Sequence, residues 1–162
     1  MDKVKFGIAG YGKMGKIREE SILNSSDAKL ISIYEISEYS HNDKSIVQCN
    51  SFDELLTTDI DAVIVSAYVS VAADYVIRAL SRGKHVFCEK PPSMTAKEMT
   101  KVIEIEKKMG KVLKYGFNHR FHYSVMEAKK VINDGSLGKM LWMRGVYGKA
   151  GSIDFHDNWR NY

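Results

Sequence analysis

Residues 4–15 read VKFGIAGYGKMG, a short apolar run followed at once by a glycine-rich turn. The spacing Gly10-x-Gly12-x-x-Gly15, with the acid Glu35 twenty positions further along the chain, is typical of a turn that binds a dinucleotide. Gly10 permits the tight turn out of the strand, Gly12 lets a pyrophosphate approach the backbone, and Gly15 lets the following helix pack closely on the sheet. The stretch therefore predicts a strand, a phosphate-binding turn and a helix, in that order.

The helix after this turn would direct free backbone N–H groups and the positive end of its dipole toward the phosphates. Glu35 closes the next apolar run, where its carboxylate can accept hydrogen bonds from the ribose hydroxyls of an adenosine. We expect NAD rather than NADP, because Glu35 would repel a 2′-phosphate and no Arg or Lys stands between Tyr34 and Asn42 to neutralise one. The predicted cofactor contacts of this region are Gly10, Tyr11, Gly12, Lys13, Met14, Gly15 and Glu35.

Two other interpretations of the glycine pattern stay open. A glycine-rich turn can serve packing alone. A P-loop is the second alternative, because residues 10–15 followed by Lys16 match most of G-x-x-x-x-G-K. Ile17, however, stands where a P-loop requires Ser or Thr to hold magnesium, and Gly12 together with Glu35 favours the dinucleotide.

The composition is that of an ordinary globular protein. The 162 residues are 44% hydrophobic and 27% charged, and the net charge of +4 is spread along the chain, which does not favour a nucleic-acid partner. Cys49 and Cys88 form neither a C-x-x-C motif nor a zinc set, so we expect no metal and a reducing, cytoplasmic location. The longest uncharged stretch, residues 62–73, is too short to span a bilayer, and no signal peptide precedes the first strand, so no membrane partner is expected.

Apolar strand patterns alternate with helical patterns as far as residue 115. This alternation predicts an α/β fold of Rossmann type, a doubly wound parallel sheet with helices on both faces. The polar segment 37–49 is expected to be a loop or a short helix, with His41 exposed. The expected strands are residues 4–9, 29–34, 62–67, 85–88 and 111–115, and the expected helices are residues 13–23, 53–56, 72–82 and 95–109.

Ligands of such sheets bind beyond the carboxyl ends of the strands. The turn at residues 66–70 therefore faces the same crevice as the glycine turn, and we predict that Ser66, Ala67 and Tyr68 contact the cofactor. Beyond residue 118 the pattern changes to one helix, at 124–133, and one strand, at 140–147, which cannot bury a core of their own.

A second motif resembles the signature of a known family. Residues 82–91 read RGKHVFCEKP and resemble the G-K-H-V-x-x-E-K-P signature of the Gfo/Idh/MocA oxidoreductases, named after glucose–fructose oxidoreductase and inositol dehydrogenase. The chain is thereby identified as similar to the N-terminal part of such a protein. Other segments similar to the family are SFDELL at 51–56, DAVIV at 61–65, YGFNHRF at 115–121, GSLGK at 135–139 and the pair Trp159-Arg160.

The resemblance implies an NAD-binding Rossmann domain at residues 1–118 and the truncated start of an α/β second domain, for substrate and oligomerisation, at residues 119–162. It implies an oxidoreductase that transfers a hydride between a nicotinamide cofactor and a hydroxyl-bearing carbon of a sugar, cyclitol or sugar nucleotide. It also implies a homo-oligomeric full-length form. The sequence does not select among these substrates.

The resemblance also assigns site residues. Lys90 becomes the catalytic lysine, in contact with substrate and cofactor, because hydride transfer at a carbinol carbon requires a proton to move on the oxygen. The alternative is an exposed turn lysine. His119 is a candidate for the substrate pocket, and its spacing to His122 lacks the further ligands of a metal site. The remaining implied cofactor contacts are Glu89, Asn118, Trp159 and Arg160.

Two departures from the family pattern bear on function. Residues 66–72, SAYVSVA, lack the proline and the histidine of the family's Thr-Pro-Asn-like run. The glycine-rich segment that carries the family's catalytic histidine and aspartate is not among the 162 residues, so we expect the chain alone to be inactive. A non-catalytic NAD-binding module and an inactive truncated fragment are the alternatives to the cofactor-binding half of a dehydrogenase.

Overall fold

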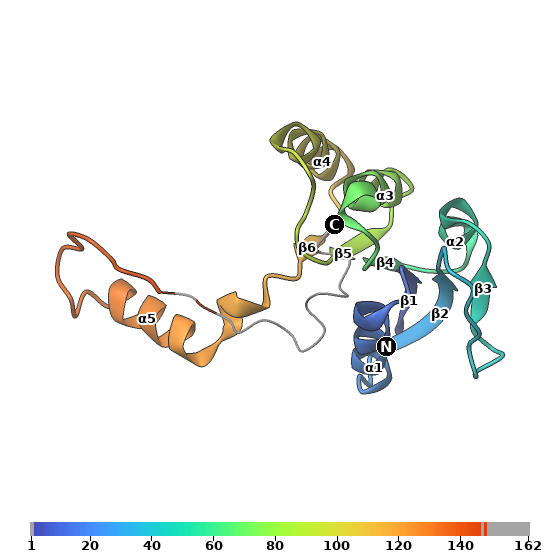
Figure 1. The fold of residues 1–162 in the computed structure, drawn as a ribbon, viewed down its shortest axis with the longest axis horizontal. Helices are drawn as coiled ribbons and strands as arrows, with labels where there is room; N and C mark the ends of the chain where they lie inside the picture. Colours follow the sequence, from blue (N-terminus) through green and yellow to red (C-terminus); the bar gives the residue numbers. More distant parts are fainter. Residues whose placement is uncertain (1, 147, 149–162) are drawn as a thin grey trace. The chain divides into compact units, whose positions relative to one another are not determined.

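The computed structural model describes residues 2–146 and 148 of the chain. The chain divides into two units, residues 1–117 and residues 118–162 (Figure 1). The first unit contains the sheet. It also contains all of the predicted cofactor residues except Asn118, Trp159 and Arg160.

The first unit is built on a sheet of six strands. These are β1 (Val4–Ala9), β2 (Ala28–Tyr34), β3 (Val47–Cys49), β4 (Ala62–Val65), β5 (His85–Cys88) and β6 (Leu113–Tyr115). All neighbouring strands are parallel, in the order β3-β2-β1-β4-β5-β6 (Figure 1). The winding reverses between β1 and β4, so the crevice beyond their carboxyl ends is where such a sheet binds ligands.

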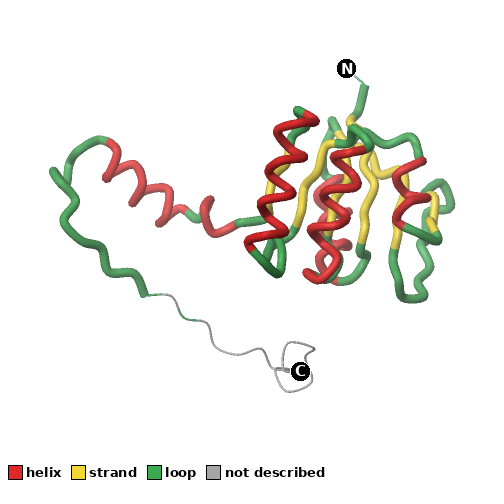
Figure 2. Tube along the Cα trace, turned by 90° about the horizontal axis from the view of Figure 1, so that it is seen from above, coloured by secondary structure: helices red, strands yellow, loops and turns green. Residues whose placement is uncertain are grey.

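Helices cover both faces of this sheet, and those of one face lie in front of the strands in Figure 2. They are α1 (Lys13–Leu23), α2 (Phe52–Thr57), α3 (Val69–Ser81) and α4 (Ala96–Met109). Side chains alternate between two cores, as in β4, where Val63 and Val65 pack with α2, α3 and α4 while Ile64 packs with α1. The doubly wound parallel sheet predicted from the sequence is therefore confirmed.

Local signals in the sequence fix two helix starts. The Glu98 N–H donates to Thr95 Oγ1 at 3.2 Å and the Thr95 N–H donates to Glu98 Oε2 at 3.1 Å, which completes a capping box at the start of α4. That helix ends at Gly110, whose φ of +61° suits a residue without a side chain. Ser51 caps α2 by accepting a hydrogen bond from the Glu54 N–H at 3.1 Å.

In the first unit, the largest differences from the sequence expectation are at residues 47–49 and 66–71. Residues 47–49 form β3, where a loop or short helix was expected, because three residues at a sheet edge are too short to show an alternating pattern. The chain leaves β4 after Val65 and begins α3 at Val69, three residues before the expected helix. Ser66 is still anchored to the sheet, since its N–H donates to the Ala9 carbonyl at 2.8 Å.

The second unit contains a short 3-10 helix, η1 (Asn118–Phe121), and helix α5 (Tyr123–Asn133). The strand predicted at 140–147 is wrong for residues 140–146, which form no strand, and Tyr147 lies outside the described residues. A strand needs a neighbour to pair its N–H and C=O groups, and the described residues of this unit hold no other strand. The assignment of this unit to a substrate domain stays a prediction.

In the residues that the structure describes, none of the helices combines the length and the apolar character needed to cross a bilayer.

Candidate functional site

The glycine turn after β1 is fixed by close backbone contacts. Gly10 has φ of +91°, and an added Cβ there would lie 2.6 Å from the backbone of Ser66 and Ala67. The Gly10 N–H donates to the Tyr34 carbonyl at 2.8 Å, and the Ser66 hydroxyl donates to the Gly10 carbonyl at 2.6 Å. The turn is thus held between the ends of β2 and β4, and only glycine fits position 10.

Gly15 and Gly12 are required for different reasons. An added Cβ at Gly15 would lie 2.3 Å from the Gly10 carbonyl oxygen, so α1 can pack on the turn only without a side chain there. At Gly12, by contrast, no heavy atom of the described residues lies within 4 Å of such a Cβ, apart from its neighbours in the chain. The position therefore opens onto free space, as a turn that receives a pyrophosphate requires.

The N-terminus of α1 offers donors to this open space. In the described part of the chain, no side chain caps this end of the helix, and its first turn holds no acidic residue. The first N–H groups of a helix have no partner within the helix, and they favour an anion. Lys13, exposed, and Met14, half-buried, stand in this first turn. The arrangement fits the phosphates of a dinucleotide.

Glu35 is held at the carboxyl end of β2. Its Oε2 accepts the Tyr11 N–H at 2.5 Å and its Oε1 accepts the Ser37 N–H at 3.1 Å. A carboxylate has about four acceptor positions, so both oxygens can still accept from ribose hydroxyls. The two backbone contacts orient the carboxylate beside the glycine turn.

The Tyr11 side chain turns into the core instead of toward the open side of the turn. It is buried, its hydroxyl donates to the Glu19 carboxylate, and its ring centroid lies 5.4 Å from that of Tyr39. Burial and the neighbouring Glu19 carboxylate raise the pKa of the Tyr11 phenol above its usual range. Any contact of Tyr11 with a cofactor would therefore come from its backbone.

His41 is partly buried, so the expected exposure was wrong. Only 11% of its side chain is exposed, and its Nε2 lies 2.7 Å from Glu19 Oε1. The Asp43 N–H approaches Nδ1 at 3.1 Å. Burial opposes the charged imidazolium, but the hydrogen bonds to Glu19 and to the Asp43 carbonyl outweigh it and raise the pKa of His41. His41 thereby ties the loop after β2 to α1.

The turns after β4 and β5 lie at the same edge of the sheet. Ser66 and Ala67 are half-buried, and Tyr68, 61% exposed, stands just before α3. Glu89 follows β5 and its N–H donates to the Val65 carbonyl at 2.8 Å. Lys90 comes next and is exposed. The structure thus brings the glycine turn, residues 66–68 and Lys90 to the carboxyl ends of the adjacent strands β1, β4 and β5.

The remaining predicted site residues lie outside the first unit. Asn118 and His119 are exposed residues of η1, where the His119 ring stacks on the His122 ring at 4.6 Å. Trp159 and Arg160 lie outside the described residues. Across residues 2–146 and 148, no group of three or more His, Cys, Asp or Glu side chains could hold a metal ion.

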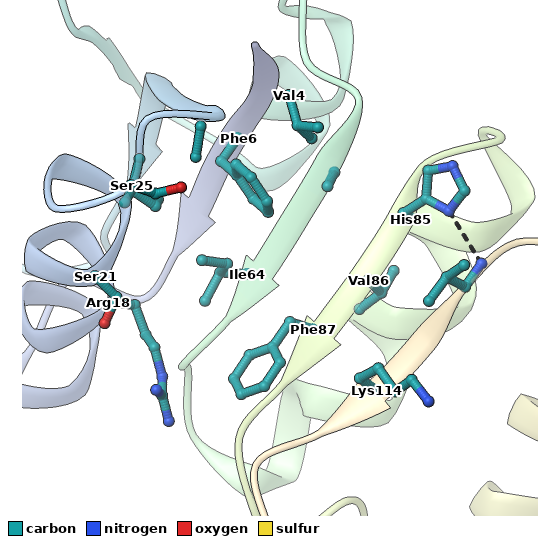
Figure 3. Close-up of a pocket in the computed structure, with 14 residues that line it drawn as sticks. Val4, Phe6, Arg18, Ser21, Ser25, Ile64, His85, Val86, Phe87 and Lys114 are labelled. Carbon is teal, nitrogen blue, oxygen red and sulfur yellow. Dashed lines mark hydrogen bonds between the residues drawn. The ribbon is translucent and has the colours of Figure 1, made fainter. Parts of the chain in front are cut away.

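A separate groove of about 560 Å³ lies on the face of the sheet beside α1 (Figure 3). Its walls are mostly apolar, including Phe6, Ile64 and Phe87, with Arg18 at the edge formed by α1. No residue of the glycine turn lines it. This groove is distinct from the crevice at the carboxyl ends of the strands.

The two thiols are not candidates for nucleophiles. Burial raises the pKa of Cys49 to about 11 and that of Cys88 to about 12, so both are protonated near neutral pH.

An open glycine turn, an uncapped helix N-terminus and an oriented acid at the end of the next strand define a dinucleotide-binding Rossmann domain. A family model described as "Oxidoreductase family, NAD-binding Rossmann fold" matches residues 4–117. The chain belongs to this family, the Gfo/Idh/MocA oxidoreductases.

Similar proteins act on inositol, according to their names. The inositol 2-dehydrogenase of Salmonella paratyphi B is 30% identical over 159 residues, 93% of this chain and 47% of that protein. The myo-inositol 2-dehydrogenase of Thermotoga maritima is 32% identical over 142 residues, 84% of this chain and 42% of that protein. The scyllo-inositol dehydrogenase structure from Lactobacillus casei with NAD(H) and scyllo-inositol has a TM-score of 0.77 at 26% identity, covering 85% of this chain and 43% of that one. The chain thus spans less than half the length of these relatives.

The His41–Glu19 contact predicts a pH-dependent stability. Because the folded pKa of His41 is raised, its contribution is fully present below the unfolded pKa of about 6.5 and is lost as the pH rises through the folded value. The excess unfolding free energy of the wild type over His41→Gln should therefore shrink with rising pH, measured by urea unfolding on either side of neutrality. The exposed His122→Gln is the control, and an excess that is constant with pH would contradict the prediction.

Proposed function

We propose that the chain is the cofactor-binding half of an NAD-dependent dehydrogenase that oxidises a hydroxyl of a cyclitol such as inositol. The observation that carries this proposal is the free space at Gly12, the N-cap residue of α1, which has no side-chain cap, beside Tyr11, whose N–H is bound by the Glu35 carboxylate. The family description and the names of the relatives support the cofactor and the substrate class. A cytoplasmic location and a homo-oligomeric full-length form stay predictions.

Different residues of the chain would bind different parts of the cofactor. The N–H groups of the first turn of α1 would bind the pyrophosphate, and Glu35 would accept hydrogen bonds from the adenosine ribose. Ser66, Ala67 and Tyr68 border the same crevice from the end of β4. When bound, the nicotinamide ring supplies the hydride acceptor. The role of this chain is therefore to hold and orient that ring relative to Lys90.

Lys90 is proposed to handle the proton. As the hydride leaves the carbinol carbon, the hydroxyl proton must leave the oxygen, and a positioned amine can accept or relay it. Lys90 is exposed at the carboxyl end of β5. In the sheet, β5 lies next to β4, and β4 lies next to β1, the strand that precedes the glycine turn. Without the histidine and aspartate that the family resemblance implies, we propose that the 162-residue chain alone binds NAD but does not turn over inositol.

The proposal is tested first by binding. Gly12→Ala places a Cβ in open space, so the fold should lose less than about 1 kcal/mol, the scale of a changed N-cap residue. The same Cβ would meet the pyrophosphate, so NADH affinity should fall by about tenfold or more, which corresponds to about 1.4 kcal/mol. Fluorescence titration of NADH into the purified chain measures the affinity, and thermal unfolding measures the fold.

The matched control is Gly145→Ala, where an added Cβ also has no neighbour within 4 Å among the described residues. Equal affinities for NADH in the Gly12 variant and the wild type would refute the proposed site.

The carboxylate of Glu35 should select NAD over NADP. At about 4 Å, repulsion between this carboxylate and one phosphate charge is at least about 1 kcal/mol even at the dielectric constant of water, which gives at least about a fivefold preference. Glu35→Ala should narrow the ratio of the two dissociation constants, and Glu38→Ala, on the polar loop beyond, should narrow it less. Titration of both cofactors measures this ratio, and equal or tighter binding of NADP by the wild type would contradict the prediction.

Lys90 should affect turnover more than cofactor affinity. In the full-length protein, Lys90→Ala is expected to lower kcat by roughly 10²–10⁴-fold, the usual effect of removing a positioned proton-transfer group. The dissociation constant for NADH should change far less. Lys97→Ala, an exposed lysine of α4, is the control for loss of a positive charge. A Lys90→Ala protein with normal kcat would reduce Lys90 to a turn residue.

A further inference from the structure

An arginine of α1 holds the carboxylate next to Lys90. Arg18 Nε donates to Glu89 Oε1 at 2.7 Å, and Arg18 Nη2 binds the same oxygen. Both side chains are largely enclosed, with 18% of Arg18 and 10% of Glu89 exposed. In this environment the pair is less screened than an ion pair in solvent. We call this contact the Glu89 clamp.

Two further residues complete the Glu89 clamp. The Arg18 guanidinium lies over the Phe87 ring, with Cζ 4.7 Å from the ring centroid, and Figure 3 shows the two side chains side by side. On the other side, an added Cβ at Gly116 would lie 2.7 Å from Glu89 Oε2. The carboxylate is therefore enclosed by α1, by β5 and by the end of β6.

The backbone is held by hydrogen bonds up to Glu89, and the residue that follows is exposed. The Glu89 N–H donates to the Val65 carbonyl at 2.8 Å, and the Gly116 N–H donates to the Cys88 carbonyl at 2.9 Å. Lys90, the next residue, is exposed. Glu89 is thus the last enclosed residue before the proposed catalytic lysine, and its side-chain contact limits where the Lys90 backbone can lie.

We infer that Arg18 is a positioning residue for Lys90. The inference depends on the proposed role of Lys90. Arg18 lies in the second turn of α1, the helix whose N-terminus faces the pyrophosphate site. The same helix therefore positions the cofactor's phosphates at its N-terminus and, through the Glu89 clamp, positions the lysine that contacts the substrate oxygen. Displacing a reacting group by about 1 Å can cost about 10²-fold in rate, so this coupling acts on kcat.

The chain offers a matched control for a purely structural role. Arg78 of α3 also makes ion pairs, to Asp53 at 2.6 Å and to Asp74 at 3.1 Å, and its Cζ also lies 5.0 Å from the ring centroid of Phe52. It belongs to the cluster around α2 and α3 and does not touch Glu89. Arg18→Met and Arg78→Met therefore each remove an arginine–carboxylate pair and an arginine–aromatic contact. One set lies beside Lys90, and the other lies elsewhere with more exposed carboxylates.

The experiment compares these variants in the full-length protein, with kcat, KM and the NADH dissociation constant as readouts. Arg18→Met should lower kcat by roughly 10- to 100-fold while the NADH dissociation constant changes by less than about threefold. Arg18→Lys, which keeps the charge but not the planar fork, should restore part of kcat. Arg78→Met should leave kcat within about twofold of the wild type, even where it lowers the thermal unfolding temperature as much as Arg18→Met.

A double-mutant cycle separates the possible failures. If Arg18 acts through Lys90, Arg18→Met should have little further effect on kcat in the Lys90→Ala background. Full additivity of the two losses would overturn the inference, as would a kcat for Arg18→Met equal to that of Arg78→Met. A loss of kcat in Lys90→Ala without one in Arg18→Met refutes the positioning role alone. A normal kcat in Lys90→Ala refutes the proposed function of Lys90, and the positioning role with it.

Discussion

The contact on which the first unit depends is the approach of Gly15 to the Gly10 carbonyl, which leaves no room for a side chain between α1 and the turn after β1. This contact fixes the start of α1 over the switch point of the sheet. Further along the helix, Arg18 reaches the end of β5 and Glu19 reaches His41 in the loop after β2. A single packed helix therefore links the three strand ends around the crevice.

Much of this arrangement could be predicted from local sequence. The roles of the turn glycines and the acid could be predicted because a tight turn, an open backbone and an oriented carboxylate each restrict the residue type. These residues are Gly10, Gly12, Gly15 and Glu35. Apolar runs separated by helical patterns were sufficient to predict the parallel sheet. The ends of α2 and α4 could be read because their capping contacts span only three or four residues.

Contacts between distant residues could not be predicted. Arg18 and Glu89 are 71 residues apart, and nothing in either local sequence indicates that they meet. His41 lies in a segment of polar residues, and its partial burial follows from its contact with Glu19, on a helix 22 residues earlier. The strand expected at 140–147 is absent at residues 140–146 for a related reason. Its alternating residues suit a sheet, but a strand is stable only when another strand pairs with it.

The three glycines of the turn have different evolutionary constraints. Positions 10 and 15 cannot accept even a Cβ without a backbone clash, so any descendant that keeps this fold must keep glycine at both. Position 12 has open space in front of it and an ordinary backbone conformation, so folding alone would tolerate alanine there. In a lineage released from cofactor binding, mutations would therefore accumulate at position 12 before positions 10 and 15, and the residue at 12 would record whether selection for the nucleotide has continued.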